Sequence, residues 1–347
     1  MCGAIGDYTD GSYGGCHDDD AEHPLEQVPD DLLGHIVSFL PTRDAVRTSV
    51  LSRRWRYAWT HTTHFDFDPQ TILSAADAAA ANLAVSKYNY KNIYFAIDKC
   101  SCALDFILSL SPPLTIGNLR IMSPLQLPSK AFWIVDTRHP QLFALLRENP
   151  LRSSLLGINT LTSLEIVGPL VVSSRLVIAC PILRSLKIAR LLFEKACIFQ
   201  QILSSCHKLE YLAVEECCNL DGQPLLNIQH QNLTRFRLML GPRNTNVVID
   251  TPSLVEFDLR LPGYICKDWN FVFLRVRMLE RLALTLSTSN SCRGIAELGA
   301  LAGKLEAVLN TVAARCNAHI HLEGNIMEVH FHTFIHSFIH SLIYRSL

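Results

Sequence analysis

A six-residue frame recurs along the chain and constrains its fold more than any other feature. It reads L-x-x-[LF]-x-[LIV], and its successive copies begin 22, 26, 24, 21 and 25 residues apart. The copies span residues 161–166, 183–188, 209–214, 233–238, 254–259 and 279–284. Each copy ends in an alternation that predicts a short strand with apolar side chains inward and polar ones outward. Because each copy has one inward row, stacked copies would build one continuous core.

The spacing of these copies falls within the range of about 20 to 29 residues that is typical of leucine-rich repeats. Three copies follow a turn signature, Cys180-Pro181, Cys206-His207 or Thr251-Pro252, that would lead the chain into the strand. Residues 194–206 have the pattern of a helix on the convex side of the solenoid. The sequence therefore predicts parallel strands joined by returning segments.

The repeat pattern is weaker before the first clear copy. Residues 92–98 (NIYFAID) and 116–122 (IGNLRIM) are interpreted as irregular strands of the same solenoid. Residues 77–85 are interpreted as a helix leading into it. Residues 128–158 do not fit the repeat and are expected to be an insertion or a degenerate repeat.

The N-terminal part of the chain has a different character. Residues 1–23 are acidic and lack apolar periodicity, which predicts a disordered leader. A row of apolar residues then follows the i, i+1, i+4, i+5, i+8 pattern of one helical face. Pro29 lies in the first turn of this predicted helix and Pro41 at its end. That row consists of Leu32, Leu33, Ile36, Val37 and Leu40.

Two more short helices are predicted after this row. Thr42 is placed to cap the first, which carries Val46 and Val50 one turn apart, and Ser52 to cap the second, which carries Trp55. A three-helix unit of about 35 residues is too small to bury all of these apolar side chains by itself. We therefore expect something else to cover its remaining apolar face.

The stretch from 25 to 68 resembles the F-box of plant F-box proteins with leucine-rich repeats, the F-box/LRR or F-box/FBD/LRR proteins. The matching elements are V-P-D-D-L-L, I-V-S-F-L-P, D-A-V-R-T-S-V-L-S-R-R-W-R and the closing F-D-F-D. The resemblance implies that the chain is the substrate receptor of an SCF-type (cullin-RING) E3 ubiquitin ligase and is not itself an enzyme. A Skp-family adaptor would dock on the F-box, and the repeats would bind an unknown protein target. The adaptor-binding residues that it implies are Pro29, Leu32, Leu33, Ile36, Leu40, Pro41, Val46, Val50, Leu51 and Trp55.

The expected fold class is α/β, with a three-helix F-box followed by a leucine-rich-repeat solenoid whose parallel sheet lines the concave face. The predicted domains are a leader (1–23), the F-box (24–68), the solenoid (69–318, irregular at 128–158) and a His-rich C-terminal cap or tail (319–347). Outward strand residues are the predicted target-binding positions, above all Glu165, Lys187, Arg237 and Asp258. An alternative function is a non-degradative scaffold or ligand sensor with a vestigial F-box.

The net charge and the cysteine spacing argue against several classes of partner and of cysteine-based site. Thirty-one basic and 32 acidic residues give a net charge of −1, which disfavours nucleic acid and anionic membrane as partners despite the five arginines between 43 and 56. The twelve cysteines form no CxxC pair, so we interpret them as small buried hydrophobes. With no secretory signal pattern, a cytoplasmic or nuclear location is expected.

No catalytic motif or cofactor fingerprint is recognisable, so we expect neither catalytic residues nor a cofactor. His332, His336 and His340 recur every four residues in the C-terminal segment and could form a metal-binding pair on a helix. The adjoining apolar residues favour an amphipathic cap instead, and no metal site is predicted.

Overall fold

The computed structural model describes part of the chain. The described residues are 28–73, 76–77, 79–80, 92–93, 95–100, 102, 116–125, 146, 158–173, 180–221, 225–241, 246–262, 270–287, 308, 310 and 319–324. The predicted leader, nearly all of the irregular region 128–158 and residues 325–347, with their three regularly spaced histidines, lie outside this set.

The N-terminal helical unit consists of three short helical segments, as predicted. They are α1 (Asp30–Ser38), α2 (Thr42–Arg47) continued by η2 (Thr48–Val50), and η3 (Trp55–His61). Pro29 and Pro41 directly precede α1 and α2, where a missing amide hydrogen removes no intrahelical bond. The Ser52 hydroxyl accepts a hydrogen bond from the amide of Trp55, the first residue of η3, at 3.4 Å.

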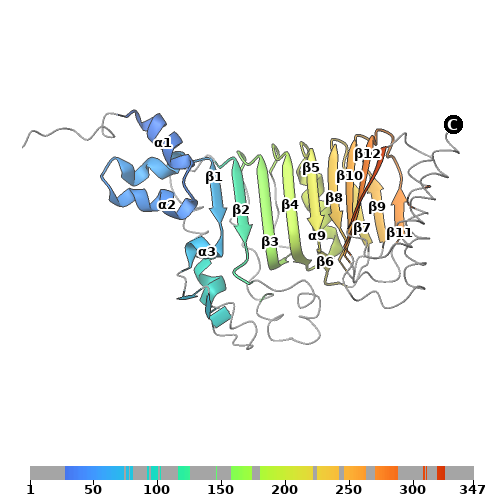
Figure 1. Cartoon of the computed structure of the whole chain (residues 1–347), viewed down its shortest axis with the longest axis horizontal. Helices are drawn as coiled ribbons and strands as arrows, with labels where there is room; N and C mark the ends of the chain where they lie inside the picture. Colours follow the sequence, from blue (N-terminus) through green and yellow to red (C-terminus); the bar gives the residue numbers. More distant parts are fainter. Residues whose placement is uncertain are drawn as a thin grey trace, which may run out of the picture.

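A long parallel sheet, the main sheet, forms the body of the described part of the chain (Figure 1). Its strands follow one another in the order β1, β2, β3, β4, β5, β8, β10, β12, β13, and β6 (Cys218–Asn219) pairs with the end of β4. Their bounds are β1 His64–Phe67, β2 Asn118–Met122, β3 Ser163–Val172, β4 Ser185–Phe193, β5 Tyr211–Glu215, β8 Arg235–Met239, β10 Glu256–Pro262, β12 Arg281–Ser287 and β13 His319–Gly324. The predicted solenoid of parallel strands is therefore confirmed.

Each of the six predicted frames leads into a strand of this sheet, β3, β4, β5, β8, β10 and β12 in turn. The first leucine of every frame lies two residues before its strand and is at most 2% exposed. The two inward positions that follow are buried as well and lie in register with their neighbours. The inner rows are Leu164, Leu186, Leu212, Phe236, Phe257 and Leu282, and Ile166, Ile188, Val214, Leu238, Leu259 and Leu284.

The turn signatures also form as predicted. In each case the amide of the first leucine in the frame donates to a carbonyl three residues earlier, as in a β-turn. These hydrogen bonds are Leu183 N to Cys180 O and Leu209 N to Cys206 O, each 3.1 Å, and Leu254 N to Thr251 O at 3.2 Å. Burial raises the pKa of the Cys180 thiol to about 12, consistent with its interpretation as a small apolar group.

The returning segments on the side opposite the main sheet change from a helix to strands along the solenoid. The predicted helix at 194–206 is α9 (Ala196–Ser205), which buries Ile198 and Ile202. Beyond it the returning segments are strands β7 (Leu225–Gln229), β9 (Asn246–Asp250) and β11 (Asn270–Phe273), which form a second parallel sheet. A strand rises about 3.3 Å per residue against 1.5 Å for a helix, so a short repeat can return with fewer residues in a strand.

One predicted strand is wrong. Within residues 92–98, the described positions are helical, and the helical pattern continues to residue 100. Ile93, Ala96 and Ile97 are each at most 3% exposed, and Cys100 is half-buried. This i, i+3, i+4, i+7 spacing places them on one helical face, and it outweighs the strand preference of the β-branched and aromatic residues.

The helical unit and the solenoid share one core. A single cluster of buried side chains extends from Leu33 and Trp59 through Phe65 of β1 to Leu284 of β12. At the far end, β13 pairs in parallel with β12, so the sheet continues into residues 319–324, which the sequence pattern assigned to the C-terminal segment.

Gly168 forms a tight corner in β3. Its φ of +122° is rarely adopted by other residues, and a Cβ added there would lie 2.4 Å from Ser123 Cβ. Val167, Ala189 and Glu215 pair across β3, β4 and β5, and the residues that follow the last two, Arg190 in β4 and Glu216 directly after β5, also have positive φ, 57° and 52°. The chain therefore bends at the same level in three successive repeats.

We expect Gly168→Ala to destabilise the protein by about 1–3 kcal/mol, because backbone strain and overlap with Ser123 add together. Gly117→Ala is the matched control: its Cβ would meet its nearest neighbour at 3.6 Å, an ordinary contact. Urea unfolding of the full chain measures both. Equal stability of the two variants would contradict the corner geometry.

His230 provides a pH test of the core. Its Nδ1 accepts from the Asn232 amide at 3.2 Å, its Nε2 lies 2.9 Å from the Cys206 carbonyl oxygen, and burial lowers its pKa. As the pH falls below about 6.5, the usual pKa of histidine, His230 takes up a proton in the unfolded chain but stays neutral in the folded chain. The free energy of unfolding should therefore decrease as the pH is lowered from about 6.5 toward the folded-state pKa. Unfolding between pH 7.5 and 5 should show this slope, and His230→Gln should reduce it.

Candidate functional site

Large apolar side chains are exposed on the helical unit, and we call them the exposed apolar set. Leu32 and Ile36 lie on α1, Phe39 and Leu40 directly after it, Val50 and Leu51 at the end of η2, and Tyr57 on η3. Among the members that lie within residues 30–51, the most exposed are Val50, Phe39 and Leu51, at 84%, 75% and 64%. A concentration of apolar surface on so small a unit indicates a covering partner.

The ten residues predicted to face an adaptor do not all lie at the surface. Seven are exposed, namely Pro29, Leu32, Ile36, Leu40, Pro41, Val50 and Leu51, and Val46 is half-buried. Leu33 and Trp55 are buried, at 1% and 7% exposed, and belong to the shared core. Their burial stabilises the helical unit and leaves little side-chain surface for direct contact with a partner. Adaptor contact by the ten residues stays a prediction.

Close helix packing explains why Leu33 is buried. Gly34 lets α1 approach η3, since a Cβ at this position would lie 2.5 Å from His61 Cβ. Leu33 and Val37 thus face the interior, whereas Leu32 and Ile36 face outward. The sequence pattern grouped both rows on one face, and only the packing of η3 separates them.

Phe39 and Tyr57 were not predicted to be part of the surface. Phe39 follows the last residue of α1, and its ring meets the ring of His35 edge-on at 4.9 Å between centroids. It lies outside the helical row that ends at Leu40. For Phe39, the only signal in the sequence was an aromatic residue shortly before Pro41, the proline predicted to end the helical row.

The arginines between 43 and 56 are partly engaged at the surface. Arg54 Nε lies 2.8 Å from Asp30 Oδ1, and Arg47 pairs with Asp44 at 3.5 Å. Surface pairs of this kind contribute little, about 0–1 kcal/mol. The arrangement agrees with a solvated polar side beside the exposed apolar set.

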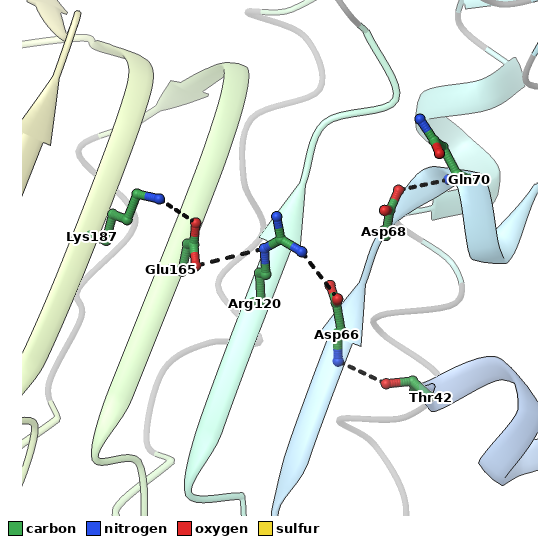
Figure 2. Close-up of polar contacts among 7 residues, drawn as sticks. All are labelled: Thr42, Asp66, Asp68, Gln70, Arg120, Glu165 and Lys187. Carbon is green, nitrogen blue, oxygen red and sulfur yellow. Dashed lines mark hydrogen bonds and ion pairs between the residues drawn. The ribbon is translucent and has the colours of Figure 1, made fainter. Parts of the chain in front are cut away.

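Strand β1 joins the helical unit to the sheet. It follows η3 directly and pairs with β2 as the first strand of the main sheet. Thr42, predicted to cap α2, instead accepts a hydrogen bond from the Asp66 amide at 2.7 Å, while Pro41 takes the position before the helix (Figure 2). The helical unit therefore covers the outer edge of the sheet.

The strand positions between the two inner rows form one row across the sheet, which we call the central row; its members are partly exposed except for Ala213, which is buried. It runs in register through Asp66, Arg120, Glu165, Lys187, Ala213, Arg237, Asp258 and Ala283. Arg120 lies between two carboxylates, 3.1 Å from Asp66 Oδ2 and 3.6 Å from Glu165 Oε2 (Figure 2).

The structure brings the four predicted target-binding residues into this row as two ion pairs. Lys187 Nζ lies 2.8 Å from Glu165 Oε1, and Arg237 Nε lies 2.8 Å from Asp258 Oδ2. Each charge therefore has an oppositely charged neighbour, and Asp258 Oδ2 also lies 3.2 Å from Arg260 Nε. Sequence reasoning missed Asp66 and Arg120, although F-D-F and L-R-I place them at the equivalent strand position.

Comparison with known proteins agrees with this architecture. Residues 25–64 match the F-box domain family. The chain is 27% identical over 246 residues to an FBD-associated F-box protein of Arabidopsis thaliana, covering 68% of this chain and 55% of that protein. Proteins of the same plant designated F-box/FBD/LRR-repeat and F-box/LRR-repeat are 28% and 29% identical, over 67% and 68% of this chain and 50% and 54% of their own lengths.

Over about two thirds of its length the chain is similar to plant F-box/LRR-repeat proteins. Its helical unit is the F-box, and its parallel sheet is the LRR-like solenoid. The chain spans about half the length of the curated relatives that it matches. An F-box points to an adaptor-type role, and proteins of this family are generally non-catalytic.

Two further features concern the described residues. None of the helices there is long and apolar enough to cross a membrane. Within the same part of the chain, no group of three or more histidine, cysteine or acidic side chains has a metal-binding arrangement.

The contact between F-box and sheet can be tested at Thr42. We expect Thr42→Val to destabilise the protein by about 1–3 kcal/mol, because the Asp66 amide loses its acceptor. Thr42→Ser keeps the hydroxyl and should stay near wild type. Hydrogen exchange at the Asp66 amide should accelerate only in the valine variant, and equal exchange in both would contradict the contact.

Proposed function

We propose that this protein is the substrate-receptor subunit of an SCF-type E3 ubiquitin ligase. In this proposal a Skp-family adaptor covers the exposed apolar set of the F-box, and a target protein binds the outward face of the sheet. The observation that carries it is the exposure of Leu32, Ile36, Val50 and Leu51 on a unit that matches the F-box family.

The energetics favour an apolar contact with the adaptor. Burying one leucine or valine side chain contributes about 1.5–3 kcal/mol, so a few of these residues could supply most of a specific interface. Protein interfaces of standard size bury about 1,600 Å² in total. Leu51 and Val50 are the leading contacts, because they project from the end of η2 with little intramolecular packing to lose.

The protein would act by holding two partners close together. The F-box and the solenoid share a core, and the Thr42 to Asp66 hydrogen bond fixes the F-box to the first strand. A target on the sheet would then have a defined position relative to the adaptor, which raises its effective concentration at the ligase without chemistry by this chain.

Leu51→Asp tests adaptor binding without disturbing the core. We expect it to weaken the Kd for a Skp-family adaptor at least tenfold, about 1.4 kcal/mol. Met278→Asp is the matched control, since Met278 is 57% exposed but lies on the solenoid. Calorimetry with the full chain measures both, and circular dichroism checks folding. Undiminished binding by Leu51→Asp would refute the proposed contact.

Leu33→Ala is a poor test of the same interface. Because Leu33 is 1% exposed, truncating it should cost about 2–5 kcal/mol of folding stability. Loss of adaptor binding in that variant would report unfolding of the F-box as readily as loss of a contact.

Exchanging a central-row ion pair tests target binding. The double variant Glu165→Lys/Lys187→Glu retains a pair across β3 and β4 but reverses its order. Arg120, 3.6 Å from Glu165 Oε2, loses a carboxylate neighbour in this variant, so we expect a stability loss of about 0–1 kcal/mol. We also expect loss of proteins captured on the full chain when ligase activity is blocked. Unchanged capture would place target recognition elsewhere on the molecule.

A further inference from the structure

Strands β5, β8 and β10 are neighbours in the main sheet (Figure 1), and their outward positions carry a tyrosine and three arginines. We call Tyr211, Arg235, Arg237 and Arg260 the arginine cluster. We propose that this cluster binds one aspartate or glutamate side chain of the target protein. The proposal deepens the proposed function, on which it rests, by assigning an acidic residue to the target.

Arg235 is the charge of the cluster that lacks a partner among the described residues. It is exposed, and its guanidinium carbon lies 5.5 Å from the centre of the Tyr211 ring. Glu256 lies across from it in register on β10, but that carboxylate pairs with Arg281 at 3.9 Å. Among the described residues, no carboxylate forms an ion pair with Arg235.

The contact with Tyr211 leaves the donors of Arg235 available. A cation over an aromatic ring is attracted by the ring electrons and uses no N–H hydrogen bond. In the described part of the chain, nothing accepts a hydrogen bond from this guanidinium. A guanidinium presents its donors in a planar fork that matches the two oxygens of a carboxylate. The ring therefore holds a cation whose preferred acceptor is still to be supplied.

Arg237 and Arg260 share one carboxylate and present the surface with more positive than negative charge. Both donate through Nε to Asp258 Oδ2, at 2.8 and 3.2 Å. Their side chains are 34% and 37% exposed, against 22% for Asp258, whose Oδ1 is inaccessible to solvent. The two guanidinium groups are thus more open to a partner than the carboxylate between them.

The remaining carboxylate on these strands is distant from Arg235. Glu215 ends β5, four residues after Tyr211, which corresponds to about 13 Å along a strand. Arg237 lies only two residues from Arg235 on the same face of β8, about 7 Å along the strand, so one acidic side chain can approach both. In the half of the central row near the F-box, by contrast, acidic and basic groups alternate and pair.

Peptide titration tests the proposed ligand chemistry. The probes are the capped peptide Gly-Gly-Glu-Gly-Gly, the same peptide with glutamine in place of glutamate, and acetate. Each is titrated into the full-length ¹⁵N-labelled protein at low ionic strength, where surface charges are least screened. The signals followed are the Tyr211 amide and the side-chain Nε–H groups of Arg235 and Arg237. We expect saturable shifts with the glutamate peptide, about fivefold weaker binding of the glutamine peptide, and weaker binding of acetate, which lacks the stem and backbone.

Arg235→Gln should weaken binding of the glutamate peptide about fivefold, because it removes the guanidinium that has no carboxylate partner. Arg277→Gln is the matched control, since Arg277 is also exposed and without an ion pair in the described part of the chain, but it precedes β12 and lies outside the cluster. Tyr211→Phe keeps the ring and should bind like wild type, whereas Tyr211→Leu should bind more weakly. Circular dichroism checks the fold of each variant.

No saturable shift, equal binding of the glutamate and glutamine peptides, or undiminished binding by Arg235→Gln would each overturn the proposal. An equal loss in Arg277→Gln would indicate non-specific charge and would contradict it as well. Acetate binding as tightly as the glutamate peptide would contradict a protein-borne side chain. These titrations contain no adaptor, so their failure is distinguishable from failure of the proposed ligase role.

Discussion

The parallel hydrogen-bond ladder of the main sheet determines how the other described elements are placed. It begins at β1, which follows the last helical segment of the F-box, and continues in register from strand to strand. An open sheet edge would leave backbone groups unpaired, and the F-box covers this one, with Thr42 bonded to the Asp66 amide. The F-box is thus the N-terminal cap of the solenoid, in addition to its proposed role in docking an adaptor.

This arrangement separates two kinds of surface. Apolar residues such as Val50 and Leu51 project from the F-box, whereas the outward face of the sheet carries paired charges such as Glu165 and Lys187. Apolar surface gains free energy when a partner covers it, but paired charges favour a partner mainly through complementary pattern. We infer that the F-box supplies affinity for an adaptor and the sheet supplies selectivity for a target.

The sequence was sufficient for the features that repeat. The six frames predicted strands β3, β4, β5, β8, β10 and β12 because inward leucines recur at similar spacing, and the turn signatures predicted how the chain enters three of them. The sequence was not sufficient where packing between elements decides which residues are buried and which strands pair. Leu33 and Leu32 look alike in the helical pattern, yet only Leu33 faces η3 and is buried. Likewise, the pairing of β9 with β7 and β11 depends on neighbouring repeats, which no single segment of sequence encodes.

The most direct test is hydrogen exchange of the full chain with and without a Skp-family adaptor. The account predicts protection of α1 and of residues 48–51 on adaptor binding, because these segments carry the exposed apolar set. It also predicts unchanged exchange in β4, β5 and β8. Protection confined to the sheet, or no protection at α1 and residues 48–51 in a saturated complex, would contradict the assignment of this surface to the adaptor.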